Sequence, residues 1–179
     1  MVTALGLLGT AVLAVSAGAS SGFAQATLRD GTGAAVGTVR LSVMGPGKVM
    51  VRASVWGLPP GFHGFHIHGV GDCSGTGFAT AGTHFVGTGG AHATHAGDQP
   101  VLLVNADGTG SATFVTDRYA IEDLFDADGS ALIVHALADN YANIPTRYAT
   151  SGTSGPDTAT LGTGDSGSRL ACGEIALTP

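Results

Sequence analysis

Residues 61–68 read Gly61-Phe62-His63-Gly64-Phe65-His66-Ile67-His68, and over residues 65–68 apolar side chains alternate with histidines. Alternation with a period of two is typical of a β-strand, where residues two apart point to the same side. His66 and His68 can therefore present both imidazoles to one metal ion while Phe65 and Ile67 pack inward. The stretch predicts a strand that has a metal on one face and the core on the other.

Similar alternation recurs along the chain in short segments. These are residues 36–43, 48–56, 101–105, 111–115, 130–137 and 169–177. Asp-Gly pairs, which are strong hairpin markers, lie between segments at residues 107–108 and 128–129, and a third precedes the first segment at residues 30–31. With 179 residues, 30 of them glycine and 11% of them charged, the chain fits one domain of strands and turns. The sequence predicts an all-β, antiparallel sandwich or barrel.

Two segments of about thirty residues, 69–100 and 138–168, lack this periodicity and are rich in Gly, Thr, Ser, Asp and Ala. Loops of that length inside a compact domain are uncommon and are usually functional or disordered. The first of them contains three histidines, so we expect the two long loops to be functional.

All seven histidines lie between His63 and His135, at spacings typical of metal ligands. Those beyond the first strand occur in Thr83-His84-Phe85, in His92-Ala93-Thr94-His95-Ala96-Gly97-Asp98 and in Ile133-Val134-His135. Nitrogen-rich, roughly planar ligation suits copper, and neutral imidazole serves both of its oxidation states. Three histidines with one carboxylate suit a closed tetrahedral zinc site. We interpret His63 as a packing or supporting residue and exclude it from the site.

The charge pattern bears on partners. The formal net charge is -6, and the seven Lys and Arg residues form no cluster in the sequence. Proteins that bind DNA or RNA carry a basic footprint, so we expect no nucleic-acid partner.

The first 26 residues contain no charged side chain, and Ala24-Gln25-Ala26 offers an A-x-A cleavage site. We interpret residues 1–26 as a signal peptide or an N-terminal membrane anchor, with the domain at 27–179 and a mature start near Thr27; a buried helix is the other interpretation. The protein is then secreted, periplasmic or in the cell envelope. In such a compartment Cys73 and Cys172 are expected to form one disulfide, the alternative being two free buried thiols.

From about residue 28 to its end the chain resembles copper/zinc superoxide dismutases of the bacterial secreted branch. The resemblance is carried by residues 64–68, 83–85, 92–98, 132–135 and 167–173, the last reading Gly-Ser-Arg-Leu-Ala-Cys-Gly. It implies a Greek-key barrel or sandwich of about eight antiparallel strands. It also implies the following roles: copper ligands His66, His68, His84 and His135; zinc ligands His84, His92, His95 and Asp98; a carboxylate, Asp139, that hydrogen-bonds ligands of both metals; an active-site arginine, Arg169; and a disulfide between Cys73 and Cys172.

The activity implied by the resemblance converts two superoxide anions and two protons into oxygen and hydrogen peroxide, with copper cycling between Cu(II) and Cu(I). His84 would bridge both ions and take up a proton, and Arg169 would attract the anion. Only two residues separate His92 from His95, which is tighter than most of the family. Zinc is therefore less secure than copper, and a site with copper alone is the competing interpretation.

Two other functions are consistent with parts of the sequence. A non-catalytic copper-binding module would need the ligands but not Arg169. Gly164-Asp165-Ser166-Gly167 resembles the nucleophile segment of trypsin-like proteases, but a histidine bound to metal cannot also serve as the base of a triad. A homodimer and retention of the N-terminus in a membrane are both left open.

Overall fold

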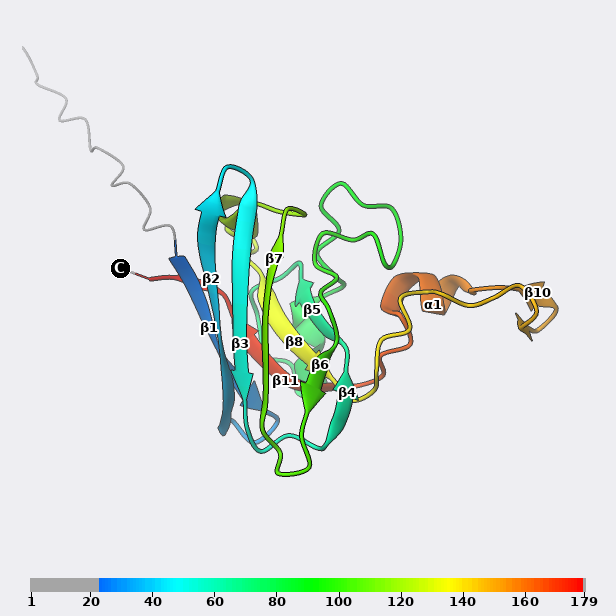
Figure 1. Ribbon diagram of the computed structural model, residues 1–179, viewed down its shortest axis with the longest axis horizontal. Coiled ribbons are helices and arrows are strands. Elements are labelled where there is room, and N and C mark those ends of the chain that lie inside the picture. The colour runs from blue at the N-terminus through cyan, green and yellow to red at the C-terminus, as the bar shows by residue number, and fades with distance from the viewer. Residues whose placement is uncertain (1–22, 179) are drawn as a thin grey trace, which may run out of the picture.

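The computed structural model describes residues 23–178, and within them ten strands form one antiparallel sheet that curls into a nearly closed barrel (Figure 1). Its strands are β1 Phe23–Asp30, β2 Ala35–Gly45, β3 Lys48–Val55, β4 Gly61–His63, β5 Phe65–His68, β6 Leu102–Val104, β7 Gly110–Thr116, β8 Ala131–His135, β11 Arg169–Glu174 and β12 Ala176–Leu177. The remaining elements are the hairpin strands β9 Ala149–Thr150 and β10 Thr153–Ser154, the helix α1 Thr158–Thr163, and the 3₁₀ helices η1 Thr76–Ala81 and η2 Ile121–Leu124. The predicted all-β antiparallel fold is confirmed.

The strand order shows how the barrel closes. Along the sheet the order is β4-β6-β7-β3-β2-β1-β11-β8-β5, with β12 paired to β1. Neighbours such as β7 and β3, or β1 and β11, are distant in sequence, as in Greek-key connections. The two ends of this path, β4 and β5, are separated in the chain by Gly64 alone. The chain itself therefore links the first and last strands of the sheet.

Strand β1 begins upstream of the mature start that the sequence predicts. Its first four residues, 23–26, pair with β2, and Ala24 and Ala26 are 1% and 3% exposed. They were assigned to the export segment because they continue its uncharged run. Residues 1–22, the rest of that segment, lie outside the described residues, so the cleavage position stays a prediction.

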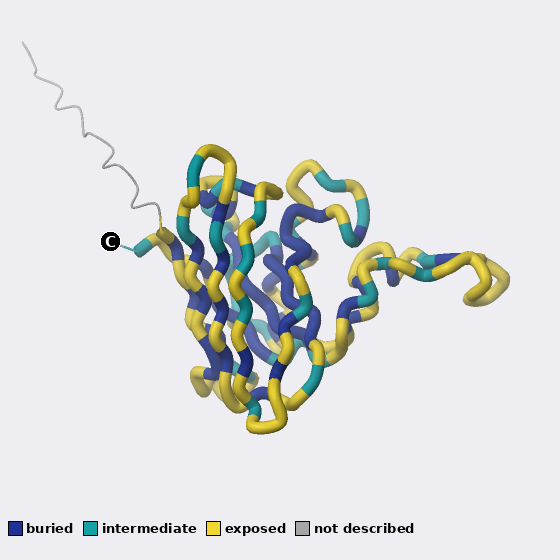
Figure 2. Tube along the Cα trace, in the orientation of Figure 1, coloured by how far each residue is buried: buried dark blue, intermediate teal, exposed yellow. Residues whose placement is uncertain are grey.

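The core fills the barrel because strands such as β1 and β3 alternate buried and exposed residues (Figure 2). The largest buried side chains in it include Leu28, Leu41, Phe65, Ile67 and Leu132, each fully buried. Burial of one such side chain contributes about 1.5 to 3 kcal/mol. The barrel is thus a rigid support for whatever lies on its surface.

The two long loops lie outside the barrel and meet each other. The second extends away from the sheet through β9, β10 and α1, and it is mostly exposed where it projects (Figures 1 and 2). Helix α1 is capped by the Asp157 carboxylate, which accepts from the Thr160 amide at 2.9 Å. The amide of His92 in the first loop donates to the carbonyl of Leu161 in α1 at 2.9 Å. Within residues 23–178 we find no helix with the length and hydropathy needed to cross a bilayer.

Candidate metal centre

Strand β5 separates the core from the predicted metal site. Phe65 and Ile67 belong to the core cluster, as their alternation with histidine predicts. His66 and His68 are also buried, at 0% and 1% exposure, but point to the other face of the strand, where further imidazoles surround them. Two histidines of one short strand are thereby presented together on its outer side.

Four imidazoles gather at this face. His135 ends β8, which pairs with β5, and His84 joins from the first long loop through an isolated bridge to His68. Ring nitrogens of His66, His68, His84 and His135 all lie within 4.8 Å of one another, and all four residues are buried. The structure therefore brings together the four residues predicted to bind copper.

The protonation of two of these rings is set by backbone carbonyls. His68 Nδ1 donates to Gly82 O at 2.9 Å, and His135 Nδ1 donates to Gly167 O at 3.2 Å. With the proton on Nδ1 in each ring, the two Nε2 atoms are bare, and they face each other at 3.4 Å. A metal cation between these two buried Nε2 atoms would be coordinated by both of their lone pairs.

Asp139 orients rings in both predicted sites. Its carboxylate accepts from His66 Nε2 at 2.6 Å and from His92 Nε2 at 2.7 Å. The other ring nitrogen, Nδ1, of each histidine is buried and forms no well-aligned hydrogen bond, although His92 Nδ1 lies 3.0 Å from Asp98 Oδ1. Buried polar atoms are rarely left unpaired, so these two orphaned nitrogens are the expected metal-binding atoms.

The predicted zinc residues converge on one oxygen. The Nδ1 atoms of His84, His92 and His95 lie 2.9, 3.0 and 3.5 Å from Asp98 Oδ1. A tetrahedral site with metal–nitrogen distances of about 2.0 to 2.1 Å has donor–donor edges of about 3.3 Å. The observed separations match that size, and the tight spacing between His92 and His95 does not keep their rings apart.

The two clusters overlap. A second group of donors within 4.8 Å contains His66, His84, His92 and Asp98. His84 and His66 therefore belong to both groups, and His95 lies beside the second, with its Nδ1 3.5 Å from Asp98 Oδ1. The centroids of the His66 and His84 rings are 4.1 Å apart.

Burial favours the neutral form of three rings in the first cluster, those of His66, His68 and His135. It lowers the pKa of His68 to about 2 and that of His135 to about 3. Burial also acts to lower the pKa of His92, but hydrogen bonds to Asp139 and Asp98 outweigh it and raise that pKa to about 9. Neutral imidazoles with free lone pairs are the form that binds metal, so His92 must release a proton when it binds an ion.

The two carboxylates of the site, Asp98 and Asp139, stay charged. Burial acts to raise the pKa of Asp98 and of Asp139, but hydrogen bonds from histidines outweigh it, and both pKa values fall below their usual range. Both groups are thus anionic at neutral pH. They concentrate negative charge where a divalent cation would neutralise it.

Comparison with known proteins identifies the family. The family model described as copper/zinc superoxide dismutase matches residues 35–175. The chain belongs to the copper/zinc superoxide dismutase family.

Relatives in this family align over most of the chain. A "Superoxide dismutase [Cu-Zn]" of Mycolicibacterium paratuberculosis is 43% identical over 159 residues, which cover 82% of this chain and 70% of the relative. The protein of the same name from Mycobacterium tuberculosis is 40% identical over 181 residues, covering 89% and 72%. A crystal structure described as a SOD-like protein from Bacillus subtilis has a TM-score of 0.66 and 29% identity, covering 84% of this chain and 96% of that one.

Both metals of the superoxide dismutase family suit the donors present. Copper fits the all-imidazole group, and zinc fits the group closed by a carboxylate. The orphaned Nδ1 atoms of His66, His92 and His95 would all be satisfied by such ions.

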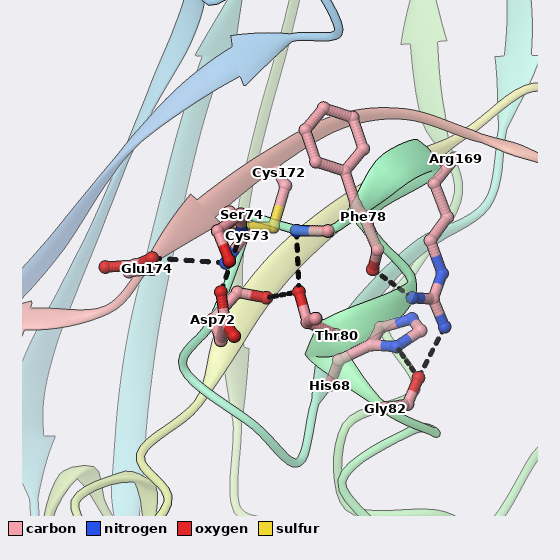
Figure 3. Close-up of a disulfide and its surroundings, with 11 residues drawn as sticks. His68, Asp72, Cys73, Ser74, Phe78, Thr80, Gly82, Arg169, Cys172 and Glu174 are labelled. Atoms are coloured by element: carbon pink, nitrogen blue, oxygen red, sulfur yellow. Dashed lines mark hydrogen bonds between the residues drawn. A yellow bond between two sulfur atoms is a disulfide. The ribbon is translucent and has the colours of Figure 1, made fainter.

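The predicted arginine lies beside the imidazole cluster. Arg169 opens β11 opposite His135, and its guanidinium donates to the carbonyls of Phe78 and Gly82 (Figure 3). Gly82 O is also the acceptor of His68 Nδ1. The arginine is thus held by the loop segment that also orients one ring of the cluster.

The predicted disulfide is present. Cys73 and Cys172 are bonded, with 5.8 Å between their Cα atoms and a sequence separation of 99 residues. The bond ties the start of the first long loop to β11, three residues beyond Arg169 (Figure 3). The segment that anchors the guanidinium is therefore covalently fixed to the strand that carries it.

Further residues shape the site; His63 was expected to pack against or support it, and the others were not predicted. His63 Nδ1 and Nε2 lie 2.7 and 2.8 Å from the carbonyls of His135 and Pro59, which ties the turn before β4 to the end of β8. Gly82 and Gly167 act through backbone oxygens, which leave no side-chain signature in a sequence. Tyr141 stacks on His92 with an interplanar angle of 10°, and only its place two residues after Asp139 could have drawn attention to it.

Proposed function

We propose that this chain converts two superoxide anions and two protons into oxygen and hydrogen peroxide. The observation that supports this most directly is the position of His84, which belongs both to the imidazole cluster and to the cluster closed by Asp98. His66 is in both groups as well, but its Nε2 is bonded to Asp139, which leaves it one ring nitrogen for a metal, whereas His84 can offer one nitrogen to each of the family's two metals. Bound copper supplies the one-electron couple that each half of the reaction needs.

In this proposal His66, His68, His84 and His135 hold copper, and His84, His92, His95 and Asp98 hold zinc. His84 Nδ1 faces Asp98 at 2.9 Å, so Nε2 is the ring nitrogen left for the copper side. That Nε2 atom is our candidate for carrying a proton to the peroxide product. Asp139 orients the rings of His66 and His92 and thereby couples the geometry of the two sites.

Arg169 binds and orients the substrate anion in this scheme. Two of its N–H groups are fixed on the carbonyls of Phe78 and Gly82, and three remain available to an anion. The protein has a formal net charge of -6, which repels superoxide at long range. A fixed cation beside the copper ligands reverses the field locally, where the substrate must dock.

We also propose that the protein acts outside the cytoplasm. The disulfide and the uncharged residues 1–26, interpreted as a signal peptide or membrane anchor, support export. The substrate is then superoxide that arises in, or reaches, that compartment.

The experiment is metal analysis followed by an activity assay on the same material. We expect one copper and one zinc per chain, nitrogen hyperfine coupling in the Cu(II) spin-resonance spectrum, and rapid decay of superoxide that slows as ionic strength rises. Stoichiometric copper without any acceleration of superoxide decay would contradict the proposal and favour a copper-binding module instead.

A further inference from the structure

The turn that carries most of the candidate zinc ligands has few ties to the barrel. Residues 91–98 contain His92, His95 and Asp98 and lie between β5 and β6, outside any strand. Their downstream end is fixed to β5, because Ile67 N donates to Gly97 O at 2.9 Å. Between His92 and His95, the backbone hydrogen bond of the turn is local, from Thr94 N to Ala91 O at 2.6 Å.

Arg118 supplies the missing tie. Its Nη1 donates to Ala93 O at 2.9 Å and to His95 O at 3.1 Å. Ala93 O has no other hydrogen-bond partner among residues 23–178. One guanidinium nitrogen therefore holds the carbonyl of Ala93, the residue after His92, and the carbonyl of His95 itself.

Arg118 itself stands on a fixed part of the barrel. It lies between β7 and η2, its amide donates to Thr116 Oγ1 at 3.2 Å, and the next residue, Tyr119, is 4% exposed. Within the part of the chain that the structure describes, the ion pairs are between histidines and aspartates, and Arg118 takes part in none of them. Its guanidinium is thus committed to the two carbonyls rather than to a carboxylate.

The direction of these bonds matters for the rings. The carbonyls of Ala93 and His95 are drawn outward toward Arg118, while the imidazoles of His92 and His95 point inward to Asp98 Oδ1, at 3.0 and 3.5 Å. Fixing the carbonyls limits rotation of the backbone that carries both rings. With only two residues between the histidines, such rotation would move both donors at once.

We propose that Arg118 is a positioning residue for zinc: it pre-organises the turn so that His92 and His95 converge on Asp98. The inference rests on the proposed function, because it requires that the second donor group binds zinc. Groups that orient metal ligands typically change metal affinity by about 10- to 100-fold. Loss of Arg118 is therefore expected to weaken zinc binding by about tenfold or more, without a change at copper.

The test compares Arg118→Met, Arg118→Lys and wild type, with Arg40→Met as the matched control. Arg40 is an exposed arginine in β2, remote in the sheet order from β5 and β8. Zinc affinity is measured by competition with a chromophoric chelator, and the geometry of the zinc site by the visible spectrum of Co²⁺ bound there. The Cu(II) spin-resonance spectrum reports the copper group.

We expect weaker zinc binding and an altered Co²⁺ spectrum for Arg118→Met, partial recovery for Arg118→Lys, and no change for Arg40→Met or in any Cu(II) spectrum. Wild-type zinc affinity and an unchanged Co²⁺ spectrum in Arg118→Met would overturn the inference while leaving the zinc site intact. Wild-type protein that binds copper but no zinc would instead refute the zinc part of the proposed function, and the inference with it. If Arg118→Met does not fold, Arg118→Lys replaces it in the test, provided that its thermal stability equals that of wild type. Zinc affinity and the Co²⁺ spectrum of Arg118→Lys then decide the question.

Discussion

Arg169 and His68 donate to the same oxygen, the carbonyl of Gly82. The residue that would guide the substrate and a residue that would hold copper are therefore aligned by one backbone atom (Figure 3). Gly82 ends the loop segment that begins at the disulfide residue Cys73. The position of the guanidinium therefore depends on this loop segment as well as on β11.

Replacing Arg169 with alanine should slow superoxide decay by about tenfold or more and flatten its dependence on ionic strength, because local attraction of the anion is lost. Copper content and the Cu(II) spectrum should stay as in wild type, since no copper ligand changes. Arg40→Ala, which removes an exposed arginine of β2, is the control for net charge. An unaltered rate and salt dependence in Arg169→Ala would rule out the guiding role.

Asp139→Asn should weaken zinc binding about 10- to 100-fold. In either orientation the amide turns its NH₂ group toward a ring N–H: toward that of His92 if nitrogen replaces Oδ1, and toward those of both His66 and His92 if it replaces Oδ2. Zinc retention is measured by dialysis against a chelator followed by elemental analysis. Asp107→Asn, in an exposed turn, should retain zinc like wild type; equal retention in Asp139→Asn would contradict the predicted role.

Gly164→Ala should disturb the same contact from the backbone side. A Cβ at this position would overlap both the Asp139 carboxylate and His92 Nε2, and Gly164 has a φ of +58°, which favours glycine. We expect loss of zinc and a lower melting temperature. Gly162 lies in α1, and a Cβ added there would meet open space. Gly162→Ala should therefore keep zinc and raise the free energy of unfolding by about 0.5 to 1 kcal/mol. Zinc loss in both variants would point to α1 in general rather than to this contact.

Removal of the disulfide in Cys73→Ser/Cys172→Ser should lower the free energy of unfolding by about 4 to 5 kcal/mol, the chain-entropy value for a loop closed over 99 residues. Urea unfolding of the metal-free proteins measures it. The residual folded protein should also show a weaker salt dependence of superoxide decay, because the loop that fixes Arg169 is released. Retention of full salt dependence would mean that Arg169 is held without the covalent tie.

Tyr119 predicts a loss of stability at high pH. Burial raises the pKa of Tyr119 to about 12, above the value of about 10 expected in the unfolded chain. The folded state holds the Tyr119 proton to higher pH than the unfolded chain does. The contribution of Tyr119 to the free energy of unfolding is therefore complete below about pH 10 and is lost as the pH rises through about 12, by about 1.4 kcal/mol for each pH unit. Between pH 9 and 12 wild type should therefore lose about 2 to 3 kcal/mol of unfolding free energy relative to Tyr119→Phe. A constant difference across that range would contradict the prediction.

Much of the site could be predicted because its chemistry lies in side chains at regular spacing. The spacing of His66 and His68 predicts both a strand and a metal site. Asp98, three residues after His95, adds a carboxylate at a spacing typical of metal ligands. Backbone atoms and long-range contacts leave no comparable signal. The carbonyl of Gly82, the close approach of Gly164 and the hydrogen bonds of Arg118 depend on how distant segments pack, which no local pattern encodes.

The fold was predictable where apolar residues alternate between clear turns, as in β2, β3 and β7. Strand β1 was missed: the first segment assigned to a strand begins at residue 36, and residues 23–26 share the uncharged composition of the segment before them. Helix α1 was missed because Thr and Gly are poor helix formers; it depends on the Asp157 cap and on packing of the loop.

The four residues of β5 leave no tolerance for error in strand alignment. If β5 slipped by one residue along β8, the two rings now facing outward would turn into the hydrocarbon interior and the two core side chains would take their place. A misaligned molecule would lose its interior packing and its capacity to hold an ion in the same step. Metal capture by this protein therefore also reports that its barrel has been assembled correctly.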